Sequence, residues 1–320
     1  MNNGFTEIKG ARLKNYTTFK IGGKVETLIE CYKTEALIEC VKKFGQVKVL
    51  GRGSNILASD NGYDGVILIN RTSRIEEFKD EFEHKVNSTL HVPNSAMFIF
   101  DSGVRLSQAS KFFLDKSLSG LEFASGIPGT MGGAVFMNAG AHLSSISDVV
   151  EFVDVLRNGE VVRLTNEECE FGYRNSKFKN KEECVKYEVE KKFYNNSILH
   201  IPHSKPDIIL RVGIRGTLSN RREIFEKIEK YREFRRNTQP SGFSAGSVFK
   251  SAEKPAGYYI DNAGLKGLSI DGAEVSKIHA NFIINTGFAT AKAVKDLIKI
   301  VKARVKDEFG VELDEEIEYI

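Results

Sequence analysis

The chain has 320 residues, of which 41% are hydrophobic and 28% charged, and its formal net charge is +3 at pH 7. This composition is typical of a globular protein of about two or three domains, and acidic and basic residues interleave too evenly to favour a nucleic-acid partner. No apolar run reaches the roughly 18–20 residues of a membrane span, and residues 1–20 lack the apolar block of a signal peptide. We therefore expect a cytoplasmic protein with no membrane partner.

The first part of the chain predicts an α/β unit. Residues 25–31 and 47–50 have the composition of short strands. Between them the apolar spacing predicts a helix over 35–44, capped by Thr34 and ended by Gly45.

A glycine-containing loop, GRGSN at 51–55, follows the second strand. The next predicted element, at 65–70, is a strand rather than a helix, and no third glycine lies at the required spacing, so a Rossmann site is not expected. We interpret the loop as a tight turn whose N–H groups form an anion nest suited to a pyrophosphate; the alternative is a plain β-turn. The candidate cofactor residues in it are Gly51, Arg52, Gly53, Ser54 and Asn55.

The middle of the chain is richer in predicted strands. Residues 71–100 show no clean period and are interpreted as strands and loops. A helix is expected to start at Ser107 and to end at Gly120, and 149–165 predicts a hairpin turning at Asn158-Gly159. Further strands are expected over 187–194 and 208–218.

From residue 218 onward the sequence becomes more helical. A charged helix is expected after Ser219 or Asn220, either of which can cap it. Thr290 is expected to cap a second helix that Gly310 ends, and the chain finishes on a strand-like tail, residues 311–320.

The most unusual segment is GLEFASGIPGTMGGAVFMNAGA at 120–141, which holds six glycines and a single charge, Glu122. Glycine lets backbone amides approach a flat or anionic ligand without an intervening Cβ, and the apolar residues between the glycines suit a buried contact. A dinucleotide with a ring system fits this pattern; the alternative is close packing inside a glycine-rich core. The candidate cofactor residues are Gly126, Ile127, Pro128, Gly129, Thr130, Gly132, Gly133 and Asn138.

The cysteines and histidines do not suggest a metal site. Cys31, Cys40, Cys169 and Cys184 form no Cys-x-x-Cys pair, so buried reduced thiols are expected. The sequence HIPH at 200–203 has no companion ligand at metal-binding spacing.

Taken as a set, seven segments resemble the UDP-N-acetylenolpyruvoylglucosamine reductase (UDP-N-acetylmuramate dehydrogenase) family of bacterial cell-wall synthesis. They run in order from residue 15 to 320: NYTTFKIGG, GRGSNILASDNGYDGVI, GLEFASGIPGTMGGAVFMNAGA, FGYRNSKF, SAGSVFK, AGLKGLSIDGAEVSKIHANFIIN and FGVELDEEIEYI. Residues 71–100 and about 179–210 match poorly, and the second of these looks like an insertion.

This resemblance implies an α+β architecture with a two-subdomain FAD-binding fold of the vanillyl-alcohol-oxidase (PCMH) type and a C-terminal α/β substrate-binding domain. The implied divisions are 1–72, 73–217 and 218–320, with the tail 311–320 packing near the first. It also implies FAD and NADPH as cofactors and UDP-N-acetylglucosamine-enolpyruvate as substrate. Nothing in the sequence requires more than a monomer.

In the implied reaction, NADPH reduces the flavin, which then gives a hydride to the methylene carbon of the enolpyruvyl ether. Arg174 matches the residue that binds the substrate carboxylate, Ser247 the proton donor and Glu316 the catalytic glutamate. We expect Glu316 to be protonated at a raised pKa, because an ionised carboxylate would repel the developing charge. Strand alternation predicts that Glu315 faces the opposite way and that Glu318 shares the face of Glu316.

The same resemblance places Tyr173 and Lys250 at the substrate, alongside Arg174 and Ser247. Many relatives carry Lys, Asn and Arg where this chain has Thr238, Ser251 and Glu318. These departures predict weaker attraction to the substrate diphosphate, for which Arg235, Arg236 and Lys250 are the candidates to compensate.

Two other functions are alternatives. Another FAD oxidoreductase of the same fold, acting on an alcohol or a sugar, would keep both glycine loops but would not need Arg174, Ser247 and Glu316 together. A non-catalytic nucleotide-binding protein would explain the glycines alone. The sequence therefore favours the reductase.

Overall fold

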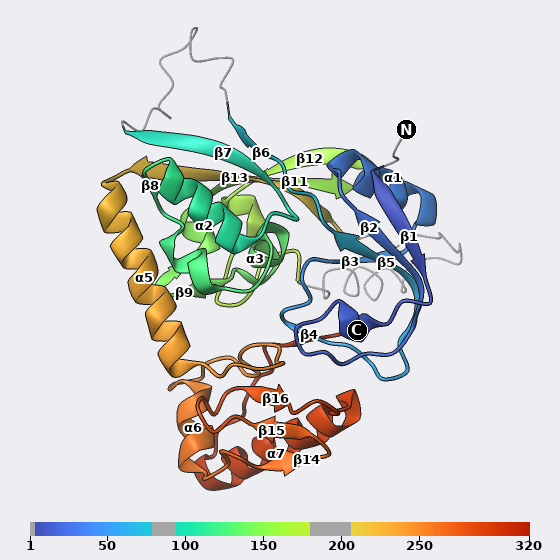
Figure 1. Ribbon diagram of the computed structural model, residues 1–320, viewed down its shortest axis with the longest axis vertical. Coiled ribbons are helices and arrows are strands. Elements are labelled where there is room, and N and C mark those ends of the chain that lie inside the picture. The colour runs from blue at the N-terminus through green and yellow to red at the C-terminus, as the bar shows by residue number, and fades with distance from the viewer. Residues whose placement is uncertain (1–3, 79–93, 180–205) are drawn as a thin grey trace, which may run out of the picture. The chain divides into compact units, whose positions relative to one another are not determined.

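The computed structural model describes residues 4–78, 94–179 and 206–320 (Figure 1). Contacts divide the chain into two compact units. Unit 1 comprises Met1–Tyr32, Val47–Arg71 and Glu229–Ile320, and unit 2 comprises Lys33–Gln46 and Thr72–Ile228. The boundary between Ile228 and Glu229 falls within helix α5 (Arg221–Thr238). The three-part division expected from the sequence remains a prediction.

The N-terminal part of unit 1 is built on a mixed four-stranded sheet. Its first strand pairs antiparallel with the second, and the other two pairs are parallel. The buried side chains of this sheet, among them Leu28, Ile67 and Ile69, form a core with Leu13 and Val25. The strand order is β1 (Phe5–Lys9), β2 (Val25–Cys31), β5 (Tyr63–Asn70) and β3 (Val47–Leu50), which confirms the strands predicted in this region.

The loop after β3 leads into a short strand, β4 (Ile56–Leu57), which confirms the argument against a Rossmann site. The C-terminal strand β17 (Glu318–Tyr319) pairs with β4 in parallel. Ser59 N–H donates to the carbonyl of Ile320 at 2.7 Å, so the last residues of the chain lie along the segment that follows GRGSN.

The C-terminal part of unit 1 packs two helices and a small antiparallel sheet around a second core (Figure 1). Thr290 Oγ1 accepts from Ala293 N–H at 3.1 Å and Gly310 adopts φ 69°, which confirms both predicted ends of helix α7. The apolar face of α7 is buried against the sheet. The elements are α6 (Ala256–Asn262), β14 (Ser269–Ile270), β15 (Ala273–Val275), β16 (Ile283–Asn285) and α7 (Ala291–Phe309).

Unit 2 contains an antiparallel sheet with helices α2 and α3 on the same side of it (Figure 1). Phe98 and Phe100 on the sheet pack edge-on against Phe112 of α2. The sheet order is β12 (Glu160–Thr165), β11 (Val150–Arg157), β13 (Ile208–Leu218), β7 (Ser95–Asp101) and β6 (Ile75–Glu77), with β8 (Leu118–Ser119) also on β13. The helices are α1 (Thr34–Phe44), α2 (Leu106–Asp115) and α3 (Met131–Met137), and a small hairpin joins β9 (Gly140–Ala141) to β10 (Ser144–Ser145).

Most predicted boundaries in unit 2 are confirmed. Asn158 and Gly159 form the hairpin turn with φ values of 51° and 87°. Asn220 rather than Ser219 caps α5, because its Oδ1 accepts from Arg222 N–H at 2.9 Å.

Two predicted helix ends are wrong. Lys33, not Thr34, is the N-cap of α1, and the Thr34 hydroxyl instead donates to Asp101 at 3.0 Å. Helix α2 ends at Asp115 and not at Gly120, because the chain turns at Lys116 and enters β8 first.

Some expectations fall outside the described residues, namely the strand over 187–194, the histidines of HIPH and Cys184. Cys31, Cys40 and Cys169 are buried, as expected. None of the helices in the described ranges combines the length and hydropathy that crossing a bilayer requires.

Candidate active site

The glycine-rich stretch of unit 2 contains a short helical turn, Glu122–Gly126, and helix α3. Thr130 Oγ1 accepts from Gly133 N–H at 3.4 Å and so caps α3. Gly133 is exposed, and a Cβ built there meets nothing closer than this oxygen, at 3.5 Å. Bare backbone therefore faces outward at the start of α3.

Ser125, directly before Gly126, has an unusual environment. Its side chain is buried with 6% exposure, yet within the described residues its hydroxyl makes no hydrogen bond. A buried hydroxyl without a partner costs about 1–3 kcal/mol, so the site favours an external polar atom that would satisfy it. The bare backbone at Gly133 and this hydroxyl both fit a bound cofactor.

Two of the predicted cofactor glycines are explained by the protein's own packing. A Cβ on Gly132 would lie 2.8 Å from Ser102 Cβ, and one on Gly53 would lie 2.4 Å from the carbonyl oxygen of Tyr16. At these positions glycine is required for close packing, which for Gly132 is the alternative considered from the sequence.

The GRGSN loop of unit 1 is tied to the C-terminal tail through Asn55. Asn55 Nδ2 donates to the carbonyl of Glu316 at 2.9 Å, and Asn55 O accepts from Glu318 N–H at 2.8 Å. Gly51, Arg52 and Ser54 are partly exposed. Asn55 thus binds the backbone of the tail, while Gly51, Arg52 and Ser54 retain exposed surface.

Arg174 lies in a tight turn closed by hydrogen bonds between Gly172 and Asn175. Its φ of 52° is unusual for a residue with a side chain and costs of order 1 kcal/mol, a form of strain that concentrates at functional sites. Arg174 Nη2 donates to the carbonyl of Gly140 at 3.0 Å, and the guanidinium lies 5.4 Å from the ring of Tyr173. Tyr173 itself is 59% exposed.

This turn is fastened to the glycine-rich stretch. Asn138 Nδ2 donates to the carbonyl of Gly172 at 2.9 Å, and Ser176 Oγ donates to the carbonyl of Phe136 at 2.8 Å. Together with the Arg174–Gly140 bond, these contacts fix the position of Arg174 relative to α3. The role of Ser176 had no signal in the sequence.

Ser247 and Glu316 lie on neighbouring segments of unit 1. Glu316 N–H donates to the carbonyl of Val248, the residue after Ser247, at 2.7 Å. Lys250 N–H donates to the carbonyl of Asp314 at 2.8 Å, and Phe249 pairs with Glu315. The structure therefore brings the backbones of these two predicted catalytic residues together.

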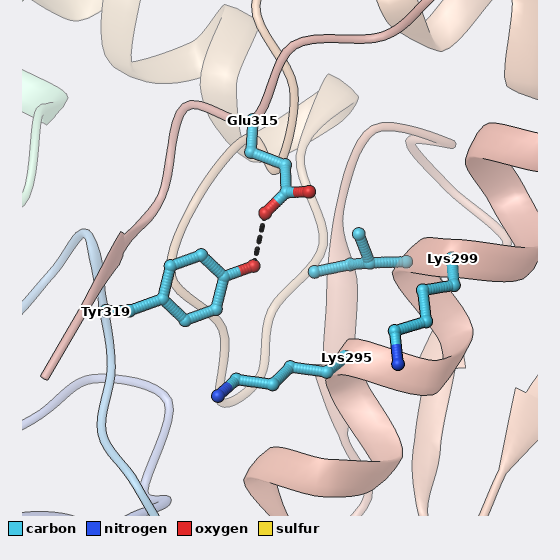
Figure 2. Close-up of a pocket in the computed structure, with 5 residues that line it drawn as sticks. Lys295, Lys299, Glu315 and Tyr319 are labelled. Carbon is cyan, nitrogen blue, oxygen red and sulfur yellow. Dashed lines mark hydrogen bonds between the residues drawn. The ribbon is translucent and has the colours of Figure 1, made fainter.

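The two adjacent glutamates differ in their surroundings. Glu315 accepts from Lys302 Nζ at 3.0 Å. It also accepts from the hydroxyl of Tyr319, and both residues line a small pocket together with side chains of helix α7 (Figure 2). Burial, followed by the hydrogen bond to Glu315, raises the pKa of Tyr319. Glu315 is therefore engaged with Lys302 of α7 and with the tail itself.

The predicted substrate-side positions are spread over the end of α5 and the segment after it. The Thr238 hydroxyl donates to the carbonyl of Phe234 at 2.7 Å, so it is turned back onto its own helix. Burial lowers the pKa of Arg235, and Ser251 is exposed.

One buried polar residue, Asn281, was missed. It lies in HANFIIN, where an asparagine inside an apolar run was the available signal. Its side-chain amide holds the backbone of Phe249, two residues after Ser247.

Comparison with known proteins covers both units. Residues 27–165 match the FAD binding domain family, and residues 239–320 match the C-terminal domain of UDP-N-acetylenolpyruvoylglucosamine reductase. The chain is 38% identical over 318 residues to UDP-N-acetylenolpyruvoylglucosamine reductase 1 of Bacillus anthracis, covering 96% of this chain and 92% of that protein. It is also 38% identical over 319 residues to the corresponding reductase of Caldanaerobacter subterraneus subsp. tengcongensis.

Among solved structures, the chain is similar to UDP-N-acetylenolpyruvylglucosamine reductase (MurB) from Thermus caldophilus. The TM-score is 0.73 at 29% identity, and the match covers 98% of each chain. The expected fold, a mixed α/β FAD-binding domain of the PCMH type followed by a C-terminal domain, is confirmed. The chain belongs to the UDP-N-acetylenolpyruvoylglucosamine reductase family of FAD-dependent enzymes in peptidoglycan precursor synthesis.

Proposed function

We propose that this chain reduces UDP-N-acetylglucosamine-enolpyruvate to UDP-N-acetylmuramate with electrons from NADPH, using Arg174, Ser247 and Glu316. The observation that carries the proposal is the end-to-end match to this reductase family, which includes both the FAD-binding part and the C-terminal domain.

FAD is assigned to the two glycine loops. The predicted contacts in these loops that are exposed or partly exposed are Gly51, Arg52, Ser54, Asn55, Gly126, Ile127, Pro128, Gly129, Gly132 and Gly133. When bound, FAD supplies the hydride that adds to the enolpyruvyl methylene carbon. The protein's part is to bind the substrate, to stabilise the negative charge that develops and to protonate the neighbouring carbon.

Arg174 binds the substrate carboxylate in this proposal. A guanidinium offers two parallel donors that match a carboxylate, and it stays charged throughout the reaction. Negative charge spreads into the carboxylate as the hydride adds, so the contact strengthens as the reaction proceeds. The fixed turn around Arg174 supports this role, because it lowers the cost of ordering the side chain. Tyr173 and Lys250 are assigned to the rest of the substrate.

Ser247 gives its hydroxyl proton to the carbon next to the methylene group. A serine hydroxyl is a weak acid, so the step requires a strongly basic carbon directly beside it and a source that returns the proton. Gly246, the residue before Ser247, has φ 79° and nothing within 4 Å of a built Cβ, so the backbone there borders open space.

Glu316, when protonated, donates a hydrogen bond to the developing enediolate. The engagement of Glu315 by Lys302 and Tyr319 supports assigning this role to Glu316. We also infer that the enzyme works in the cytoplasm as a monomer.

The proposal is tested by an anaerobic titration in two steps. The purified protein should be yellow, and NADPH should bleach its flavin absorbance. Addition of UDP-N-acetylglucosamine-enolpyruvate should restore the absorbance, whereas UDP-N-acetylglucosamine, which lacks the enolpyruvyl group, should not. Reoxidation by simple alcohols or sugars instead would favour a different oxidoreductase, and a colourless protein that releases no flavin on denaturation would overturn the proposal.

A further inference from the structure

The backbone that follows Ser247 is held by one buried amide side chain, that of Asn281. Asn281 is 7% exposed. Its Nδ2 donates to the carbonyl of Phe249 at 2.8 Å, and its Oδ1 accepts from the N–H of the same residue at 2.9 Å. A buried side chain that satisfies both backbone groups of one residue fixes that residue's position and its peptide planes.

The main chain of Asn281 extends this contact toward Ser247. Its carbonyl accepts from Val248 N–H at 2.8 Å, and the next residue, Phe282, pairs with Ser247. Three hydrogen bonds from one residue therefore hold Val248 and Phe249, the two residues that directly follow Ser247.

Asn281 is itself held in place by its neighbours. Its N–H donates to Nδ1 of His279 at 3.3 Å. Burial lowers the pKa of His279 and so favours the neutral ring, in which Nδ1 can accept this hydrogen bond. His279 packs edge-on against Phe282 at 5.0 Å between ring centroids. These contacts leave Asn281 little freedom to reorient.

On the other side, the same segment carries the predicted catalytic glutamate. Val248 N–H donates to the carbonyl of Asn281, and the carbonyl of Val248 accepts from Glu316 N–H. The order across these segments is Asn281, then the Ser247 segment, then Glu316. A shift of the Ser247 segment would therefore change the position of Ser247 relative to both Asn281 and Glu316.

We propose that Asn281 is a positioning residue for Ser247, which holds the hydroxyl where it can protonate the substrate carbon, and not only a stabilising residue of the core. This inference rests on the proposed function of Ser247. It predicts that loss of the Asn281 amide impairs only the half of the reaction in which the substrate is reduced, because a misplacement of about 1 Å can slow a reaction by about 100-fold.

Asn285 provides a matched control. It lies at the end of strand β16, close to Asn281 in the sequence, with 5% exposure, and its Nδ2 donates to the carbonyl of Phe19 at 3.0 Å. Its Oδ1 accepts from Gly287 N–H and Ala289 N–H at 2.8 and 3.0 Å. Asn285→Ala therefore removes a buried amide with a similar number of backbone bonds, none of them to residues 247–249.

The experiment compares Asn281→Ala, Asn281→Asp and Asn285→Ala in the full-length holoenzyme by anaerobic stopped flow. Flavin content, melting temperature, the rate of bleaching by NADPH and the rate of reoxidation by substrate are measured. Asn281→Asp keeps the shape and the acceptor for Phe249 N–H but loses the donor, so it remains informative if the alanine variant does not fold.

We expect both alanine variants to lose thermal stability and to be bleached by NADPH at a rate within about 2-fold of the wild type. Only the Asn281 variants should be reoxidised slowly, by about 100-fold, with a larger solvent deuterium isotope effect because proton transfer becomes limiting. Wild-type rates of reoxidation in Asn281→Asp, or an equal loss in Asn285→Ala, would overturn the inference. If the wild type itself is not reoxidised by this substrate, the proposed function fails instead.

Discussion

The side-chain amide of Asn55 donates a hydrogen bond of 2.9 Å to the backbone carbonyl of Glu316. Asn55 was expected at the cofactor, and Glu316 was expected at the substrate. The bond joins the GRGSN loop to the C-terminal tail within one unit. A substitution of Asn55 in the loop would therefore remove a hydrogen bond to the backbone of Glu316.

Asn55→Ala should therefore release the tail as well as weaken the loop. Loss of a buried or partly buried hydrogen bond costs about 1–2 kcal/mol, and the effect should be local to the tail. Hydrogen–deuterium exchange of residues 315–320 should increase in Asn55→Ala. Ser59→Ala, which keeps the Ser59 N–H bond to Ile320, serves as the control. Unchanged exchange in the tail of Asn55→Ala would show that the contact does not hold it.

Ser247→Ala tests the proton donor. The variant should be bleached by NADPH at nearly the wild-type rate, because no proton donor to the substrate is needed in that half of the reaction. Reoxidation by the enolpyruvyl substrate should slow by several orders of magnitude, measured by anaerobic stopped flow. An equal loss in both halves would contradict the assigned role.

The two adjacent glutamates should respond differently to substitution. Glu316→Gln keeps a hydrogen-bond donor and should impair reoxidation less than Glu316→Ala does. Glu315→Gln should leave reoxidation unaffected and lower the melting temperature slightly, because its contacts are with Lys302 and Tyr319. Equal damage from the two substitutions at Glu316 would mean that hydrogen-bond donation is not its contribution.

Glu122 should make the protein sensitive to acid. Burial acts to raise the pKa of Glu122, but hydrogen bonds from Gly120 N–H and Ser119, both 2.7 Å, outweigh burial and lower it below its usual value. A depressed folded-state pKa contributes stability above the unfolded-state pKa of about 4.5, and this stability is lost as the pH falls through the folded value.

Glu122→Gln should accordingly destabilise the protein by about 1–3 kcal/mol at pH 7, since its amide cannot accept both bonds. The difference from wild type should shrink below about pH 4.5, as followed by urea unfolding at several pH values. Glu226→Gln, which removes an exposed pair with Arg222, should change stability little. A constant difference for Glu122→Gln across this range would contradict the titration.

Local patterns predicted much of the fold. The strands at 25–31 and 47–50 and both ends of α7 have short-range signals, namely apolar periodicity, an N-cap threonine and a C-terminal glycine. Thr34 carries the same cap signal, but the helix begins one residue earlier, with Lys33 as the N-cap, and the Thr34 hydroxyl donates to Asp101, far along the chain. The parallel pairing of β17 with β4 likewise depends on residues far apart in sequence.

The candidate site likewise contains residues with a signal in the local sequence and residues without one. Resemblance to the reductase family predicts Arg174, Ser247 and Glu316 as site residues, whereas Asn281 and Ser176, whose side chains bind the backbone near Ser247 and Arg174, were not predicted. Their partners are backbone groups of distant segments, which leave no mark on the local sequence.

The bonds around Arg174 have an evolutionary consequence. Asn138, Arg174 and Ser176 donate to main-chain carbonyls, those of Gly172, Gly140 and Phe136. Every amino acid supplies a carbonyl, so mutation of an acceptor such as Phe136 leaves its bond available, while mutation of a donor removes one. Natural variation should therefore accumulate on the accepting side of this framework and be purged from the donating side, except at Gly140, where a built Cβ would lie 2.6 Å from the carbonyl oxygen of Ser144.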